Sequence, residues 1–112
     1  MKAMQKEIVL LPFPFSDLGG TKVRPAIVVS SNNFNKKSND CIMVPLTTII
    51  KDEPYSFIIS QQDLNSGKLL KPSRVRADKI FTIENDLIVM KIGTISDKTF
   101  ERLKSKIIKC FG

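Results

Sequence analysis

Short apolar segments separated by polar turns dominate the pattern of hydrophobic and polar positions along this chain. The segments are rich in valine and isoleucine, and most are too short for helices, which is typical of β-strands. The run at residues 25–30 is apolar without alternation, so we expect a strand that is buried on both faces. The pattern predicts strands at residues 7–11, 25–30, 41–47, 55–60, 73–80 and 87–95.

The residues between these segments predict loops and turns. Pro12 and Pro14 follow the first predicted strand, and because proline has no amide hydrogen we expect that strand to end there. The pair Gly19-Gly20 predicts a mobile tip between two strands, and Ser66-Gly67 predicts another turn. Residues 31–40 form a polar linker with room for a helical turn.

The C-terminal segment has the spacing of an amphipathic helix. Ser96 is the predicted N-cap, and Asp97 beside it places a negative charge at the positive end of the helix dipole. Phe100, Leu103 and Ile107 recur at intervals of three and four, which places them on one stripe together with Phe111. This stripe predicts packing against the core or against a second copy of the chain.

Six short strands and one terminal helix predict a mainly β fold. A small, strongly curved antiparallel barrel or sandwich is the expected form, because open sheet edges favour aggregation. The chain has 112 residues, shows no internal repeat, and is long enough for one core. We therefore expect a single domain over residues 1–112.

Composition adds charge to this picture. The chain has 18 basic and 11 acidic residues, a formal net charge of +7, and no histidine. Such an excess on a small domain favours a polyanion as partner, although ordinary solubility charge is the competing interpretation. Any acid–base chemistry must use carboxylate, hydroxyl, lysine or arginine groups.

The two cysteines and the N-terminus bear on the location of the protein. Cys41 and Cys110 follow neither a metal-ligand nor a redox spacing, so both are predicted to be buried thiols. The apolar run after the N-terminus is interrupted by Pro12 and Pro14, unlike a signal peptide, and no stretch reaches the ~20 apolar residues of a membrane span. A soluble cytoplasmic protein is the expectation.

The segment at residues 68–79 is the most informative for chemistry. If residues 73–80 form a strand, side chains two apart share one face. Arg74, Arg76 and Asp78 would then project together, while Val75 and Ala77 point into the core. Guanidinium groups beside a carboxylate suit a phosphodiester, whereas the competing interpretation of Arg76 and Asp78 is a surface ion pair.

Other candidate residues lie at predicted strand ends that could converge on one groove. Cleavage of RNA by its own 2′-hydroxyl needs a proton acceptor, positive charge at the phosphorane and a donor near the leaving 5′-oxygen. Asp78 can accept a proton, Arg24 and Arg76 can stabilise charge, and Thr47 can donate a hydrogen bond. Taken singly, Arg24 could also flank a loop, Thr47-Thr48 could cap a strand, and Ser73 could be a turn residue. No metal-ligand spacing and no phosphate-binding glycine loop is present in the sequence, so we expect neither metal nor cofactor.

Five blocks of sequence, in this order, resemble the MazF/PemK family of toxins over nearly the whole chain. The resemblance implies a small SH3-like antiparallel barrel of the CcdB/PemK type with a C-terminal helix, and a homodimer. It also implies a metal-independent endoribonuclease that cuts single-stranded RNA at short sequences and leaves 2′,3′-cyclic phosphate and 5′-hydroxyl ends. The implied partner is an antitoxin whose acidic, disordered tail covers the RNA groove. The blocks are residues 8–18, 24–30, 44–48, 76–80 and 91–96.

The resemblance also assigns roles to residues. It implies Arg24 as a transition-state stabiliser, Arg76 as the acid, Asp78 as the base, and Thr47 as the strand hydroxyl. Some members have a histidine or glutamate in the loop before Arg24, where this chain has Gly19-Gly20 and Asp17 is the nearest carboxylate. Candidate RNA-binding residues are Asp17, Lys22, Thr48, Ser73 and Arg74.

Two other functions fit parts of the sequence. A non-catalytic, CcdB-like toxin that binds DNA gyrase would use the helical region at residues 97–111. A plain RNA-binding module would bind RNA in a salt-dependent manner without cutting it. Fold alone does not separate these alternatives from the ribonuclease.

Overall fold

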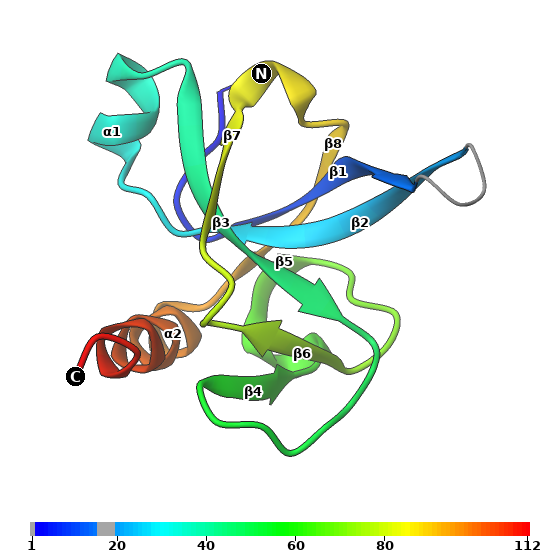
Figure 1. Cartoon of the computed structure of the whole chain (residues 1–112), viewed down its shortest axis with the longest axis vertical. Helices are drawn as coiled ribbons and strands as arrows, with labels where there is room; N and C mark the ends of the chain where they lie inside the picture. The colour runs from blue at the N-terminus through cyan, green and yellow to red at the C-terminus, as the bar shows by residue number, and fades with distance from the viewer. Residues whose placement is uncertain (1, 16–19) are drawn as a thin grey trace.

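The computed structural model describes residues 2–15 and 20–112, and for residues 13–15, 20 and 21 it describes the backbone alone. Within these residues, an antiparallel sheet curls into a half-barrel, with a short helix α1 (Asn32–Lys37) and the C-terminal helix α2 (Asp97–Lys109) beside it (Figure 1). The mainly β fold with a C-terminal helix is therefore confirmed. The strands are β1 (Glu7–Phe15), β2 (Gly20–Val28), β3 (Asp40–Thr47), β4 (Ser56–Ile59), β5 (Leu64–Gly67), β6 (Ser73–Arg76), β7 (Phe81–Glu84) and β8 (Met90–Ile95).

Strand β3 is the junction of the sheet. The strand order is β4-β6-β3-β2-β1-β8-β5, and β7 also pairs with β3. The N-terminal half of β3 pairs with β7 and its C-terminal end with β6, while β2 pairs with its middle. The C-terminal end of β3 is therefore held between β2 and β6, where the candidate residues lie.

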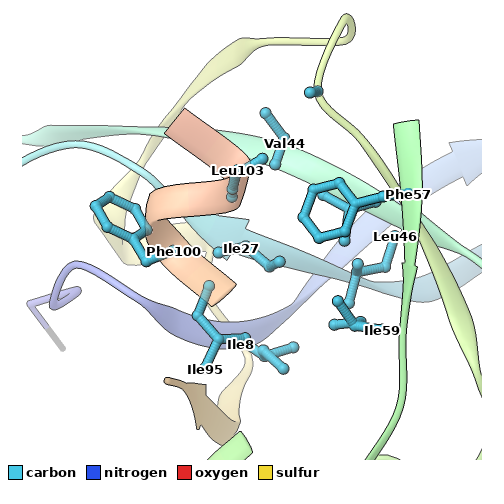
Figure 2. Packing of buried hydrophobic residues seen from close by; sticks show 11 residues of the cluster. Ile8, Ile27, Val44, Leu46, Phe57, Ile59, Ile95, Phe100 and Leu103 are labelled. Atoms are coloured by element: carbon cyan, nitrogen blue, oxygen red, sulfur yellow. The ribbon is translucent and has the colours of Figure 1, made fainter. Parts of the chain in front are cut away.

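The central strands are buried on both faces, as the unbroken apolar run at residues 25–30 predicts. Alternate residues of β1, β2 and β3 enter two separate clusters. Ile8, Ile27 and Val44 lie in the cluster that Phe100 and Leu103 of α2 complete (Figure 2). Their neighbours along the strands form the second cluster, which contains Val9, Ala26, Val28, Cys41 and Met43.

Helix α2 begins as predicted and packs by part of its stripe. The Ser96 hydroxyl caps it by accepting a bond from the Thr99 amide at 3.1 Å. Phe100 and Leu103 are buried, but Phe111 lies beyond the last helical turn and is 78% exposed. Among the described residues, neither helix has the length and apolar content needed to cross a bilayer.

Several predicted boundaries are wrong. Strand β1 continues through Pro12 and Pro14 to Phe15. Strand β1 pairs with β8 only as far as Leu10, but it pairs with β2 as far as Phe15. One edge of residues 11–15 therefore pairs with no strand, and the missing amide hydrogens of the prolines are tolerated at that edge. The strand predicted at residues 87–95 begins only at Met90, because residues 85–87 form a 3₁₀ turn.

The sequence pattern also missed two short strands. Strand β5 includes the predicted Ser66-Gly67 turn, and β7 follows the basic segment. Helix α1 lies in the polar linker at residues 31–40, where there was room for a helical turn. Strands β5 and β7 have four residues each, and most of their side chains are half-buried or exposed, so their hydrophobic alternation is weak.

The two cysteines differ in environment, which corrects the expectation that both are buried. Cys41 is fully buried, whereas Cys110 is half-buried at the end of α2. Burial, with the nearby carboxylate of Asp40 as the second cause, raises the pKa of the Cys41 thiol to about 11. Because the thiolate is the nucleophile, Cys41 is shielded from reagents both sterically and by its low thiolate fraction.

We predict that a maleimide reagent labels Cys110 in the native protein at neutral pH and reacts with Cys41 at least about a hundredfold more slowly. Peptide mapping after timed labelling measures both rates. In guanidinium chloride the two cysteines should react alike, which serves as the control. Equal native rates would show that Cys41 is not protected.

Candidate active site

Two adjoining hollows, of about 370 and 400 Å³, lie at the C-terminal end of β3. Both are lined by Arg24, Leu46, Thr47 and Ile49, and we call the two together the central groove. The sequence placed Arg24, Thr47 and Arg76 at strand ends that could converge. All three line the second hollow of this groove.

Strand register brings Arg24 beside Thr47. Strand β2 pairs with β3 through Ala26 opposite Pro45, and Arg24 lies two residues earlier on β2, as Thr47 lies two residues later on β3. Arg24 lies within β2 and not before it, and its side chain is half-buried. Thr47 is the last residue of β3, and its hydroxyl oxygen accepts a bond from the Ile49 amide at 3.1 Å.

Arg76 enters the same groove from β6, and Asp78 is bonded to it. The Nη2 atom of Arg76 lies 3.3 Å from Oδ2 of Asp78. The Nε atom of Arg76 is buried and has no hydrogen-bond partner among the described residues. The predicted strand at residues 73–80 ends at Arg76, so Asp78 lies in the turn closed by the Lys79 amide and the Arg76 carbonyl at 3.1 Å. The turn keeps the carboxylate beside the guanidinium although the two residues no longer share a strand face.

The second hollow of the groove is strongly cationic. Five of its nine lining residues carry positive charge, namely Arg24, Lys51, Arg74, Arg76 and Lys79. Two carboxylates, of Glu53 and Asp78, each form an ion pair with one of the five. The five cations make the hollow suited to an anionic group such as a phosphodiester.

Arg74 has a different environment from the other candidates. Only 5% of its side chain is exposed, and its polar contacts are with Ile49, Glu53 and Ser56. Its Nε donates to the Ile49 carbonyl at 3.1 Å, and its Nη1 lies 3.3 Å from Oε2 of Glu53 and 3.5 Å from the hydroxyl of Ser56. Sequence alternation is right that Val75 and Ala77 are buried, and Arg74 and Arg76 both line the second hollow. Arg74 is buried, however, whereas Arg76 is half-buried and Asp78 is exposed.

The other candidate RNA-binding residues are placed as follows. Lys22 and Thr48 are exposed and line the first hollow. Ser73 also lines it but is only 3% exposed, and its hydroxyl donates to the Lys71 carbonyl at 3.1 Å. Asp17 lies outside the described residues.

The structure adds residues that the sequence did not indicate. Ile49 is 60% exposed and lines both hollows, and Lys51 lines the second. The only sequence signal for them is their place directly after Thr47-Thr48. Lys79, in contrast, belongs to the basic segment already noted.

A third hollow, of about 660 Å³, adjoins the central groove and is more apolar. It shares Pro25, Thr48 and Ser73 with the first hollow of the groove. Its walls are mainly aliphatic, and lysines contribute to its lining. The further lining residues are Leu10, Lys68, Leu69, Leu70, Lys71, Met90, Lys91 and Ile92.

Comparisons with known proteins identify the family. Residues 4–111 match the family described as the PemK-like, MazF-like toxin of type II toxin–antitoxin systems. The chain is 31% identical over 85 residues to the endoribonuclease toxin MazF of Escherichia coli (strain K12). The aligned residues cover 75% of this chain and 70% of that protein.

Solved structures show the same fold. One is an endoribonuclease in complex with its cognate antitoxin from a mycobacterial species, with a TM-score of 0.77, 23% identity, and coverage of 98% of this chain and 95% of that one. Another is a chain of the MazE–MazF crystal structure from Deinococcus radiodurans, with a TM-score of 0.78, 18% identity, and coverage of 100% of this chain and 98% of that one.

The comparisons agree with the family that the five sequence blocks resemble. They confirm the predicted class of endoribonuclease toxin, and they do not favour the gyrase-binding alternative. The chain belongs to the PemK-like, MazF-like toxins of type II toxin–antitoxin systems.

Proposed function

We propose that this protein, acting as one toxin domain over residues 1–112 in the cytoplasm, cuts single-stranded RNA in the central groove without a metal ion. The observation that carries the proposal is the shared cationic hollow of Arg24, Thr47 and Arg76, with Asp78 bonded to Arg76. The products are a 2′,3′-cyclic phosphate and a 5′-hydroxyl, and short RNA sequences are preferred.

The reaction is a transesterification in which the 2′-oxygen attacks the adjacent phosphorus. Asp78 takes the 2′-hydroxyl proton, since its carboxylate is exposed and is paired with Arg76, which lines the groove. Arg24 and Arg76 bind the phosphorane oxygens through their guanidinium groups. Thr47 donates its hydroxyl hydrogen to one of these oxygens.

The bond from phosphorus to the 5′-oxygen then breaks, and Arg76 protonates the leaving oxygen. Water does not deprotonate arginine, but a departing alkoxide is a stronger base than a neutral guanidine. Proton transfer from Arg76 to the 5′-oxygen is therefore favourable in free energy. The Asp78 carboxyl, now carrying the proton from the 2′-hydroxyl, lies 3.3 Å from the guanidinium and returns it to Arg76. The proton thus passes from the 2′-oxygen to the 5′-oxygen and the pair is restored.

The proposed partners are unpaired RNA, a second copy of this chain and a cognate antitoxin. The lysines around the groove favour the RNA backbone and an acidic antitoxin tail alike, so the two compete. Leu70, Val89 and Met90 are at least half exposed, and apolar side chains exposed in this number support a protein interface.

We predict that the purified protein cleaves a long single-stranded RNA in the presence of excess EDTA. Gel mapping should give discrete fragments, and their 3′-ends should resist a ligase that needs a 3′-hydroxyl until the cyclic phosphate is removed. RNA that stays intact over a range of salt concentrations would contradict the proposed function.

We predict that Arg24→Ala lowers the rate of RNA cleavage by about 10²–10³-fold, as expected for loss of a charged transition-state contact. Thermal unfolding should change little, since Arg24 is only half-buried at the wall of a groove. Lys36→Ala removes the same charge on helix α1 and is the control. Full activity in Arg24→Ala would remove Arg24 from the site.

We predict that Asp78→Asn keeps the side-chain shape but lowers kcat by about 10²–10⁴-fold, because the amide cannot accept the 2′-hydroxyl proton. Its ion pair with Arg76 is partly exposed, so the free energy of unfolding should fall by no more than ~1 kcal/mol. Asp52→Asn, in the exposed loop after β3, is the matched control. Wild-type kcat in Asp78→Asn would assign the base to another group.

A further inference from the structure

Arg74 is a buried cation whose side-chain hydrogen bonds go to the segment after β3 and to Ser56, the first residue of β4. The residue is 4% exposed, and the segment at residues 48–55, which has no helix or strand, leads from β3 to β4 as the green loop in Figure 1. A charge buried in this way is expensive unless it is paired and hydrogen-bonded. Glu53 supplies the opposite charge, and the Ile49 carbonyl accepts from Nε at 3.1 Å.

The peptide units on both sides of Ile49 are hydrogen-bonded, one to Thr47 and one to Arg74. The Ile49 amide donates to the Thr47 hydroxyl oxygen at 3.1 Å, and the Ile49 carbonyl accepts from Arg74. Thr47 and Arg74 are also direct partners across the β3–β6 pair. The three residues therefore close a small ring at the end of β3.

This ring restricts what the Thr47 hydroxyl can do. A threonine hydroxyl has two lone pairs and one hydrogen. One lone pair accepts from the Ile49 amide, and no acceptor among the described residues takes the hydroxyl hydrogen. That hydrogen is therefore available to a ligand in the central groove, which Thr47 lines.

We propose that Arg74 is a positioning residue for RNA cleavage: it holds Ile49 so that the Ile49 amide fixes the Thr47 hydroxyl as a hydrogen-bond donor to the scissile phosphate. The inference rests on the function proposed above. It replaces direct RNA contact as the role of Arg74, since the guanidinium is bonded within the protein and covered.

Other contacts of the segment cannot replace Arg74. The Ser56 hydroxyl donates to the Glu53 carbonyl at 2.8 Å, and the Ala77 amide donates to the Tyr55 carbonyl at 3.1 Å. Both bonds hold the end of the segment next to β4. The end that carries Ile49 has the bonds to Thr47 and Arg74, so loss of Arg74 frees it to move away from Thr47.

A double-mutant cycle on kcat tests whether Arg74 acts through Thr47. Thr47→Val removes the hydroxyl at nearly constant shape and should lower kcat by about 100-fold, and Arg74→Met should lower it by about 10-fold with a small change in KM. If Arg74 acts through Thr47, the double variant should lose only about 100-fold. Independent effects would multiply to about 1000-fold, and that result would overturn the inference.

A measurement on the protein alone separates this inference from the proposed function. Hydrogen exchange of the Ile49 amide, followed by NMR, should be at least about tenfold faster in Arg74→Met and in Thr47→Val, because each loses part of the ring. Unchanged exchange in Arg74→Met would overturn the inference whether or not RNA is cut. Wild-type protein that cuts no RNA would reject the function while the exchange result still decides the positioning role.

Two further variants guard against unfolding and simple charge effects. If Arg74→Met does not fold, Arg74→Lys keeps the charge opposite Glu53 but lacks the planar fork that reaches Ile49 and Glu53 together, so it should show the same changes at smaller size. Lys104→Met removes one positive charge from α2 and should leave both kcat and Ile49 exchange at wild-type values. An equal loss in Lys104→Met would show that net charge, and not position, is responsible.

Discussion

The register of β3 against its neighbours is the constraint on which the central groove depends. Met43, Val44 and Leu46 are buried in two different core clusters, so a shift of one residue would move apolar side chains out of each cluster. The same register sets Thr47 opposite Arg74 and near Arg24. The hydrophobic core thus fixes where the polar residues of the site meet.

A cluster of positive charge is the second feature of the groove, and the fold limits its cost to stability. Like charges in one hollow repel, and a surrounding medium of low polarity strengthens the repulsion. Arg74 is the most buried of the five cations and has its own carboxylate, Glu53, whereas the lysines of the hollow are exposed to water. The most buried charge is therefore paired within the protein, while the lysines face water where a phosphodiester can reach them. The arrangement favours polyanion binding at a small cost in folding stability.

Much of this arrangement follows from the sequence. The strand predicted at residues 41–47 and the helix capped by Ser96 match β3 and α2 closely. The apolar run at residues 25–30 marks only the end of β2, which begins at Gly20 and ends at Val28. Elements β5 and β7 have weak signals because each is short and mostly half-buried or exposed. Convergence of Arg24, Thr47 and Arg76 was a hypothesis from strand ends, and only the pairing of β2 and β6 with β3 turns it into a shared hollow.

Arg74 shows why sequence periodicity does not settle a residue's role. Alternation places Arg74 and Arg76 on the same side of β6, away from the core side of Val75. Which of them meets solvent depends on the segment after β3, whose path over Arg74 is set by tertiary contacts with Ile49 and Glu53. A shared face is a local property of the strand, whereas exposure is a property of whatever covers it. Two arginines two residues apart can therefore serve the same groove differently, one by contact with the phosphate and the other by holding the wall that shapes it.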